Sequence, residues 1–377
     1  MSCARKTNSG VIGDRPRVAL TLGDVAGIGP EVIARVCADP ELHRICRPVV
    51  FGNAQVLRRA AKLVGTDLTV IERDDAAEIP SDSECVLCVD PAGSVAAEVT
   101  PATVDARAGE AAYLYLKAAI QAVADNAVDA LTTAPINKLA LRRAGIPFPG
   151  HTELLADAFG VDQFAMLLYL PAGDDVRSPT GLAVAHATLH TAIANVPRLL
   201  TPGGILEKIT LVDQFLTTLG CADRRIGVCA LNPHAAEGGL FGDEEDRIIA
   251  PAVQMACDRG LRASGPIPSD TLLRHAVHGD FDGVVAMYHD QGHIALKLVA
   301  FERAVNVTLG LPIVRTSPSH GTAFDIAWQG KASPRGMFEA IRVAVQLAAV
   351  RRTATDVART SVGPEDSLGR SPKSPRR

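Results

Sequence analysis

The chain has few aromatic residues and no strong excess of either charge, and both features narrow its class. Aromatic residues make up 4% of the 377 residues, with a single tryptophan, whereas 47% are hydrophobic. Small aliphatic residues therefore dominate, as they do in sheets that are covered by helices on both faces. The formal net charge is −4 and the two signs are interspersed, so we expect no binding to nucleic acid or to an anionic membrane.

Long apolar segments are also missing. No run approaches the roughly 20 apolar residues of a membrane-spanning helix, so we expect no membrane segment. The first residues lack the apolar core of a signal peptide, and we interpret 1–15 as a flexible leader. The eight cysteines are scattered, as in a large protein whose thiols stay reduced, which predicts a cytoplasmic location.

Two patterns that would indicate a metal or nucleotide site are incomplete. Cys85 and Cys88 form a CxxC pair inside the apolar strand pattern ECVLCV, but no second pair exists to complete a tetrahedral site. We therefore interpret them as structural residues. The glycines of GDVAGIGPE, residues 23–31, do not match the GxGxxG fingerprint of a dinucleotide-binding turn. A packing turn is the better-supported interpretation of that segment.

Strand and helix patterns alternate along the chain, which predicts an α/β fold. The length favours two domains over a single core. Ligands in open α/β sheets bind beyond the carboxyl ends of the strands, so polar residues that follow apolar strand patterns are candidate site residues. The segment after about residue 352 lacks apolar periodicity, and we expect 353–377 to be a disordered tail.

Three histidines stand at the ends of apolar strand patterns. His186 ends GLAVAH, His234 follows IGVCALNP and His289 follows VVAMY. They are about 50 residues apart, as in successive strand–helix units, so parallel strands would bring them together. Histidine is the commonest metal ligand and a catalytic metal typically keeps three protein ligands, so the pattern favours a divalent metal site. A single histidine at a strand end is more often an ordinary polar residue than a metal ligand. The same interpretation applies to the remaining seven histidines. His190 and His293 are less certain, because each lies within four residues of a proposed ligand.

Lys297, Asn306 and Arg315 are separated by apolar segments that should be buried. Because an unpaired buried cation is costly, these side chains either emerge at loops or have anionic partners. Lysine and arginine with an amide donor would make a cradle for phosphate or carboxylate. An equally supported alternative is internal ion pairing with the nearby acidic residues, Asp290, Glu302 and Asp325.

A metal beside such a cradle suits the oxidation of a secondary alcohol next to a carboxylate. The metal can bind hydroxyl and carboxylate oxygens together and lower the pKa of the alcohol. Hydride would leave to a cofactor, and the metal would stabilise the enolate when the resulting β-keto acid loses carbon dioxide. The alternative from another class is a metal-binding or phosphate-ligand-binding protein without turnover.

Eight motifs together carry a family resemblance. Between about Arg17 and Ala349 they occur in the order GDVAGIGPE, PINK, GHTE, NPHAAEGGLFGDEE, PSDT, YHDQG, VNVTLGLPIVRTSPSHGTAFDIA and GKAS. In this order the chain resembles the 4-hydroxythreonine-4-phosphate dehydrogenase family, best known from pyridoxine biosynthesis. The resemblance implies NAD- or NADP-dependent oxidation and decarboxylation of a phosphorylated hydroxy acid. It also implies a divalent metal: zinc, magnesium, manganese or cobalt.

The resemblance implies an architecture as well. It predicts a two-domain α/β/α sandwich like that of isopropylmalate dehydrogenase, with a first domain at 16–145 plus 310–352 and a second at 146–309. It further implies a homodimer whose active site lies in the interdomain cleft at the subunit interface. One metal histidine would then come from the partner subunit.

The family's functional residues carry over motif by motif, as expectations. The metal ligands would be His186, His234 and His289. The catalytic residues would be Asp270, Asp290 and Lys297, and the substrate contacts would be His151, Thr152, Lys297, Asn306 and Arg315. The cofactor would lie near the last loops, around Gly310, His320, Gly321 and Thr322.

The chain departs from the family pattern near the first metal histidine. The family usually has threonine-threonine-histidine with an apolar-proline-leucine continuation, whereas this chain reads VAHATLH from Val184 to His190. Val25 and Ala236 also stand where proline and glycine are usual. The leading substrate is 4-phosphooxy-L-threonine (4-hydroxythreonine 4-phosphate), which would yield 3-amino-2-oxopropyl phosphate. The alternatives are D-threonate or D-erythronate 4-phosphate, and a dihydrodiol dicarboxylate from aromatic catabolism.

Overall fold

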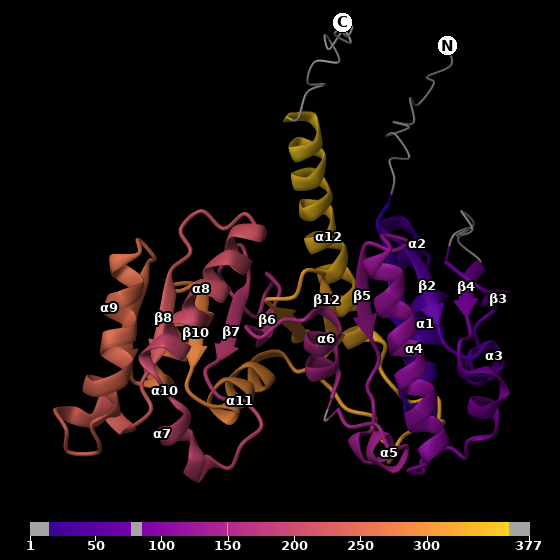
Figure 1. Cartoon of the computed structure of the whole chain (residues 1–377), viewed down its shortest axis with the longest axis horizontal. Helices are drawn as coiled ribbons and strands as arrows, with labels where there is room; N and C mark the ends of the chain where they lie inside the picture. Colours follow the sequence, from indigo (N-terminus) through magenta and orange to yellow (C-terminus); the bar gives the residue numbers. More distant parts are fainter. Residues whose placement is uncertain (1–14, 77–84, 149, 362–377) are drawn as a thin grey trace, which may run out of the picture.

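The computed structural model describes residues 15–76, 85–148 and 150–361. A 12-stranded sheet runs through it, with the strands in the order β3-β4-β2-β1-β5-β12-β11-β6-β7-β10-β8-β9. Helices pack against the sheet along its length (Figure 1). The predicted α/β class is confirmed.

The strands are short, and most neighbours run parallel. β11 and β6 run antiparallel to both of their neighbours. The strands are β1 (Arg17–Thr21), β2 (Arg47–Phe51), β3 (Thr69–Arg73), β4 (Cys85–Val89), β5 (Ala130–Thr133), β6 (Ala165–Leu170), β7 (Leu182–His186), β8 (Ile226–Cys229), β9 (Ala263–Ile267), β10 (Gly283–Ala286), β11 (Val305–Leu309) and β12 (Arg315–Pro318).

The strand order separates two groups along the sheet. β3, β4, β2, β1, β5 and β12 come from 17–133 and 315–318, whereas the other six strands come from 165–309. In Figure 1 the two groups occupy opposite ends of the long axis. The antiparallel pair β11–β12 joins them, so the sheet is continuous across the predicted domain boundary. The division into two domains stays a prediction.

The helices vary from one turn to 27 residues. They are α1 (Gly29–Cys37), α2 (Pro40–Ile45), α3 (Ala54–Val64), α4 (Ala106–Ala124), α5 (Lys138–Arg143), α6 (His151–Phe159), α7 (Val196–Leu199), α8 (Pro202–Thr218), α9 (Ala250–Asp258), α10 (Ser269–Val277), α11 (His289–Ala300) and α12 (Arg335–Ser361). Short turns are η1 (Gly93–Glu98), η2 (Ile193–Asn195), η3 (Pro233–Glu237) and η4 (Glu245–Ile249).

Burial on both faces explains the apolar strand patterns, because side chains alternate between faces that are both covered. Every residue of β7 is buried, as are the last four of β4. The CxxC pair lies in β4, where the Cys88 thiol donates to the Gly52 carbonyl at 3.1 Å. Burial raises the pKa of Cys88 to about 12, which keeps the thiol protonated. The structural interpretation of this pair is confirmed.

The glycine-rich turn between β1 and α1 is a packing turn, as predicted. A Cβ on Gly29 would collide with the carbonyl oxygen of Leu22, and a Cβ on Gly27 would lie 2.9 Å from Thr322. Only glycine tolerates such close approach of one backbone segment to another. The glycines therefore let this turn lie directly against the loop that follows β12.

The same turn and helix hold that loop in place. The Ile28 amide donates to the Thr322 carbonyl at 3.0 Å. Further along, Gly330 is held from both sides, since its amide donates to Glu31 Oε1 and its carbonyl accepts from Arg35, each at 2.7 Å. Glu31 is fully buried. We call this set of contacts the loop clamp; it fixes the segment that begins beside the candidate site.

The predicted terminal segments fall mostly outside the described residues. The predicted leader lies there except for Arg15, and so do 362–377 of the predicted tail. α12 continues to Ser361, so 353–361 is helical, and the expectation of disorder from 353 onward is wrong for that part. These residues extend a helix that begins at Arg335, and adding a residue to an existing helix is much easier than starting a new one. Within the described ranges, no helix has both the length and the apolar character needed to cross a membrane.

Candidate functional site

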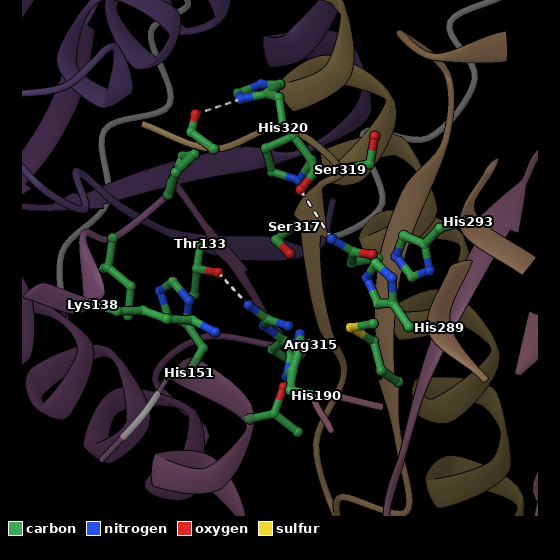
Figure 2. Close-up of a pocket in the computed structure, with 18 of the residues that line it drawn as sticks. Thr133, Lys138, His151, His190, His289, His293, Arg315, Ser317, Ser319 and His320 are labelled. Atoms are coloured by element: carbon green, nitrogen blue, oxygen red, sulfur yellow. Dashed lines mark hydrogen bonds between the residues drawn. The ribbon is translucent and has the colours of Figure 1, made fainter. Parts of the chain in front are cut away.

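A cavity of about 310 Å³ lies in the middle of the sheet, where the two strand groups meet. Its walls come from the end of β5, the starts of α5 and α6, helix α11, and the β11–β12 pair with the loop that follows it. The lining residues are Thr133, Pro135, Ile136, Lys138, Gly150, His151, Thr152, Glu153, Met166, His190, His289, His293, Lys297, Asn306, Arg315, Ser317, Pro318, Ser319, His320 and Gly321. Figure 2 shows most of these side chains.

Local sequence explains how two walls are placed. Asn137 caps α5 by accepting from the amides of Leu139 and Ala140, which sets Lys138 at the first position of that helix. His151 likewise opens α6, directly after Gly150. Among the described residues no side chain caps α6, so the first amides of that helix have no intrahelical partner and its start presents positive potential to the cavity.

The structure brings together all five predicted substrate contacts, although they come from four separate elements. The predicted substrate residues that line the cavity are His151, Thr152, Lys297, Asn306 and Arg315. In Figure 2, Arg315 lies between the side of the cavity that carries Lys138 and His151 and the side that carries His289 and His293. The convergence therefore matches the expectation, while the role of each residue stays a prediction.

Arg315 is a buried cation without an ion pair among the described residues. Its side chain is held by hydroxyls: Nη2 donates to Thr133 Oγ1 at 2.8 Å and Nη1 to Thr308 Oγ1 at 3.1 Å. Arg315 is only 4% exposed, and its Nε is buried without a partner in the described part of the chain. Burial lowers the pKa of Arg315 to about 10, while the negative charge of Glu153 acts in the opposite direction. Such a site favours an anionic ligand.

The alternative of internal ion pairing is not what the structure shows. Asp290 pairs with His289 at 2.6 Å, and Glu302 lies 3.8 Å from Arg335. Within the described residues neither Lys297 nor Arg315 forms an ion pair with Asp290, Glu302 or Asp325. Lys297 instead donates from Nζ to the Ser319 carbonyl at 3.1 Å, and burial lowers the pKa of its ammonium. The anion cradle is the better-supported of the two interpretations.

Four histidines gather at one end of the cavity. The rings of His289 and His293 stack with centroids 3.8 Å apart, and His190 lies 5.8 Å from His289. His293 Nδ1 and His186 Nε2 are 3.1 Å apart. Burial lowers the pKa of His186 to about 4 and that of His293 to about 3. Both rings are therefore neutral near pH 7, which is the form of imidazole that can bind a metal.

Asp290 positions His289. Its carboxylate Oδ1 lies 2.6 Å from His289 Nδ1, which fixes the proton on that nitrogen and leaves Nε2 with a lone pair. A carboxylate behind a histidine is the common arrangement of metal ligands. Asp290 does not line the main cavity but a second one of about 420 Å³ beside it. The expectation that Asp290 acts directly on substrate is therefore less well supported than a positioning role.

The three predicted metal ligands do not converge within one chain. The rings of His186 and His289 lie 6.1 Å apart, but His234 follows β8 in η3, does not line the cavity, and has Phe241 as its ring neighbour at 6.5 Å. In the part of the chain that the structure describes, no group of three or more His, Cys, Asp or Glu side chains is arranged to hold a metal. His186 and His289 offer two imidazole ligands, so a metal fits only if further ligands come from elsewhere.

The other predicted residues divide into those at the cavity and those away from it. His320 and Gly321 line it, whereas Gly310, Thr322 and Asp270 do not. Gly310 has φ +86° in the turn between β11 and β12, which explains the glycine structurally. Asp270 is exposed in the first turn of α10, where its Oδ1 accepts from the Thr271 amide at 2.8 Å.

Sequence reasoning did not assign several lining residues to the site. They are Thr133, Lys138, Glu153, His190, His293, Ser317 and Ser319. Lys138 and Glu153 belong to the family motifs PINK and GHTE, which could have identified them as site residues. His293 stands four residues after His289, one helical turn along α11, so it shares that face. Ser317 and Ser319 carried no signal, because single serines are common on any surface.

Comparison with known proteins gives close relatives over most of the chain. A family model described as "Pyridoxal phosphate biosynthetic protein PdxA" matches residues 44–344. The chain is 44% identical to a 4-hydroxythreonine-4-phosphate dehydrogenase of Geobacter metallireducens, over 89% of this chain and 97% of the relative. It is 42% identical to a D-threonate 4-phosphate dehydrogenase of Cupriavidus necator, over 89% of this chain and 98% of the relative.

A solved structure gives the same picture. The fold aligns with a 4-hydroxythreonine-4-phosphate dehydrogenase from Klebsiella pneumoniae with a TM-score of 0.78 and 40% sequence identity. The alignment covers 89% of this chain and 98% of that chain. These relatives are named as dehydrogenases, which is the class of enzyme that the motifs predicted.

Proposed function

Because this chain belongs to the pyridoxal phosphate biosynthetic protein PdxA family, as its motifs predicted, we propose that it is a metal-dependent, NAD- or NADP-linked dehydrogenase. Its substrate is a phosphorylated four-carbon hydroxy acid. The reaction oxidises the secondary alcohol by transferring hydride to the nicotinamide, releases the hydroxyl proton, and ends with loss of carbon dioxide from the β-keto acid. The first candidate substrate is 4-hydroxythreonine 4-phosphate, and D-threonate 4-phosphate is the second.

The observation that carries the proposal is the buried Arg315, which has hydroxyl partners but no ion pair in the described chain. Lys138 and Thr152 line the same cavity. The Nε2 atom of the half-buried His151 is buried there and has no partner in the described part of the chain. Burial, followed by the charge of Arg315, lowers the pKa of His151 well below its ordinary value, so its ring is neutral. These groups hold the phosphate end of the substrate by direct hydrogen bonds and charge.

The metal would be held by His186 and His289 of one subunit and His234 of the other. A metal held there would lower the pKa of the substrate hydroxyl and would stabilise the charge that develops during decarboxylation. Asp290 keeps His289 in the ligating tautomer. The protein's own task is to orient the alcohol and carboxylate toward this end of the cavity while Arg315 holds the phosphate.

A homodimer is part of the proposal because the cavity of one chain lacks His234. Helix α11 supports it: His293 and Lys297 line the cavity, whereas Ile294, Leu298 and, directly after the helix, Phe301 are 58%, 82% and 51% exposed. A contiguous apolar patch of this kind commonly marks a protein interface. A second copy seated on α11 would lie next to the cavity.

The test is turnover by the full-length protein. It is incubated with NAD or NADP, with magnesium, zinc, manganese or cobalt, and with each of the two candidate phosphates or a dihydrodiol dicarboxylate. Nicotinamide reduction and carbon dioxide release are followed. We expect reduction with one phosphate well above the other. A dihydrodiol dicarboxylate as the better substrate, or tight binding without any reduction under all conditions, would overturn the proposal.

A further inference from the structure

The backbone around His234 is left-handed over several residues. The four residues from His234 to Glu237 all have positive φ, between +46° and +62°, and the two glycines that follow continue the pattern. We call this segment, 234–239, the left-handed turn. A side chain at positive φ places its Cβ too close to the following carbonyl oxygen, so four consecutive non-glycine residues in this conformation are strained. Such strain persists only when the surrounding structure holds it, and it clusters at functional sites.

A buried carboxylate holds the residues that lead into the left-handed turn. Glu245 is 2% exposed, and its Oε1 accepts from the amides of Leu231 and Asn232 at 2.8 and 2.7 Å. Its Oε2 accepts from Asn232 Nδ2 at 2.9 Å. Hydrogen bonds to an ionised carboxylate are roughly twice as strong as those between neutral groups. Glu245 therefore fixes the backbone two residues before His234.

The chain leaves the left-handed turn past the same contacts. Glu244 Oε2 also accepts from Asn232 Nδ2, at 2.8 Å. Gly242 has φ +137°, and a Cβ there would lie 2.6 Å from Glu244 Oε2 and 2.7 Å from Asn232 Nδ2. The two ends of the segment therefore meet at Asn232. Between these ends, His234 is exposed and Leu240 is 75% exposed.

We propose that Glu245 is a positioning residue, which holds the left-handed turn in the conformation that presents His234 to a second copy of the chain. This inference rests on the proposed function, in which His234 completes the metal site of the partner subunit. A histidine on an exposed, loosely held turn would have to be ordered each time it binds, which would weaken the site. Glu245 removes that cost by fixing the backbone in advance, and it acts only through the residues before His234.

The test measures metal binding by the full-length protein rather than turnover. Zinc affinity is obtained by competition with a chromophoric chelator, and the visible absorption of cobalt(II) reports the ligands around the ion. We expect Glu245→Ala to weaken zinc binding by about 10-fold to 100-fold and to change the cobalt absorption. Glu245→Gln keeps one oxygen for the two amides and should lie between wild type and Glu245→Ala. Asp246→Ala removes the neighbouring exposed carboxylate and, as the control, should match wild type.

A matched pair of variants at Glu237 tests the backbone of the turn. Glu237 is exposed and has φ +46°. Glu237→Gly and Glu237→Val both remove the carboxylate, but glycine adopts positive φ freely whereas a β-branched residue does not. We expect Glu237→Val to bind zinc about fivefold or more weakly than Glu237→Gly. Thermal unfolding shows whether each variant is folded, and this pair keeps the test decisive if Glu245→Ala is not.

The outcomes separate this inference from the proposed function. If zinc affinity and cobalt absorption are unchanged in folded Glu245→Ala but zinc binds more weakly to His234→Ala, Glu245 has a structural role only. The inference is then overturned and the proposed function stands. Equal zinc affinity in the two Glu237 variants would also overturn the inference, because the left-handed backbone would not be what positions His234. If wild type and His234→Ala bind zinc equally, the shared metal site of the proposed function fails and the inference fails with it.

Discussion

Arg315 on β12 donates to Thr133 on β5, a hydroxyl 182 positions earlier in the sequence. The two strands are parallel neighbours in the sheet, and the bond is buried. A guanidinium that is oriented by hydroxyls rather than by a carboxylate keeps its full charge available for a ligand. The relationship makes Arg315 the most informative single position in the proposed site.

Replacing Arg315 should weaken binding of a phosphorylated substrate more than it alters folding. Hydrogen bonds to charged groups are worth about 1.5–3 kcal/mol, so we expect Arg315→Gln to lower kcat/KM by about 10-fold to 100-fold. The kcat/KM of Arg315→Lys should lie between those of wild type and Arg315→Gln, because lysine keeps the charge but lacks the planar guanidinium with its paired donors. Steady-state kinetics give the comparison, with Arg58→Gln, an exposed arginine paired with Glu72, as the control. Equal kinetics in wild type and Arg315→Gln would contradict the assignment.

Subunits with complementary defects should restore activity if the metal site is shared. We expect His234→Ala and His289→Ala each to be inactive alone. In a mixed dimer one site would combine His289 of one chain with His234 of the other, so random mixing should restore about a quarter of wild-type activity. Activity after co-refolding or co-expression is the measurement. No recovery, with heterodimers demonstrated by differently tagged chains, would place all ligands within one subunit.

The buried Asp24 should make stability depend on pH. Burial raises its pKa from 3.8 to about 6, and its Oδ2 has no partner in the described structure. The folded state holds this proton more tightly than the unfolded state does. The stability that protonated Asp24 contributes is therefore fully present below pH 3.8 and is lost as the pH rises through about 6. At about 1.4 kcal/mol per unit, the expected loss by pH 7 is about 3 kcal/mol. Chemical denaturation across pH 4–7 should show the free energy of unfolding falling with pH in wild type and not in Asp24→Asn. The same pH dependence in both proteins would show that Asp24 is not responsible.

The loop clamp should depend on Glu31. Glu31→Ala would leave the partly buried Gly330 amide without its acceptor. A fully buried unsatisfied donor costs about 1–3 kcal/mol, so we expect Glu31→Ala to lower the free energy of unfolding by about 1 kcal/mol. Glu31→Gln keeps an acceptor oxygen and should lose less. Denaturant unfolding measures both variants, and Glu41→Ala, on an exposed glutamate, is the control. A loss no larger than that of the control would show that the clamp is not held by Glu31.

Much of the site could be predicted because sequence order and strand ends constrain it. Apolar runs identified strands such as β10, and polar residues after such runs identified Lys297, Asn306 and Arg315 as candidates. The family motifs added His151 and Thr152. These predictions depend on local pattern and on the rule that ligands bind at strand ends, so they needed no coordinates.

The sequence by itself determined the α/β class, the structural role of the CxxC pair, the packing role of the glycine turn and the five expected substrate contacts that line the cavity. These follow from periodicity, from residue size and from motif order. Only the tertiary structure decided that Arg315 has hydroxyl partners and that His234 stands outside the cavity of its own chain. Hydrogen-bond direction and distance between elements depend on which backbone atoms pack together, and spacing along a chain does not contain that information.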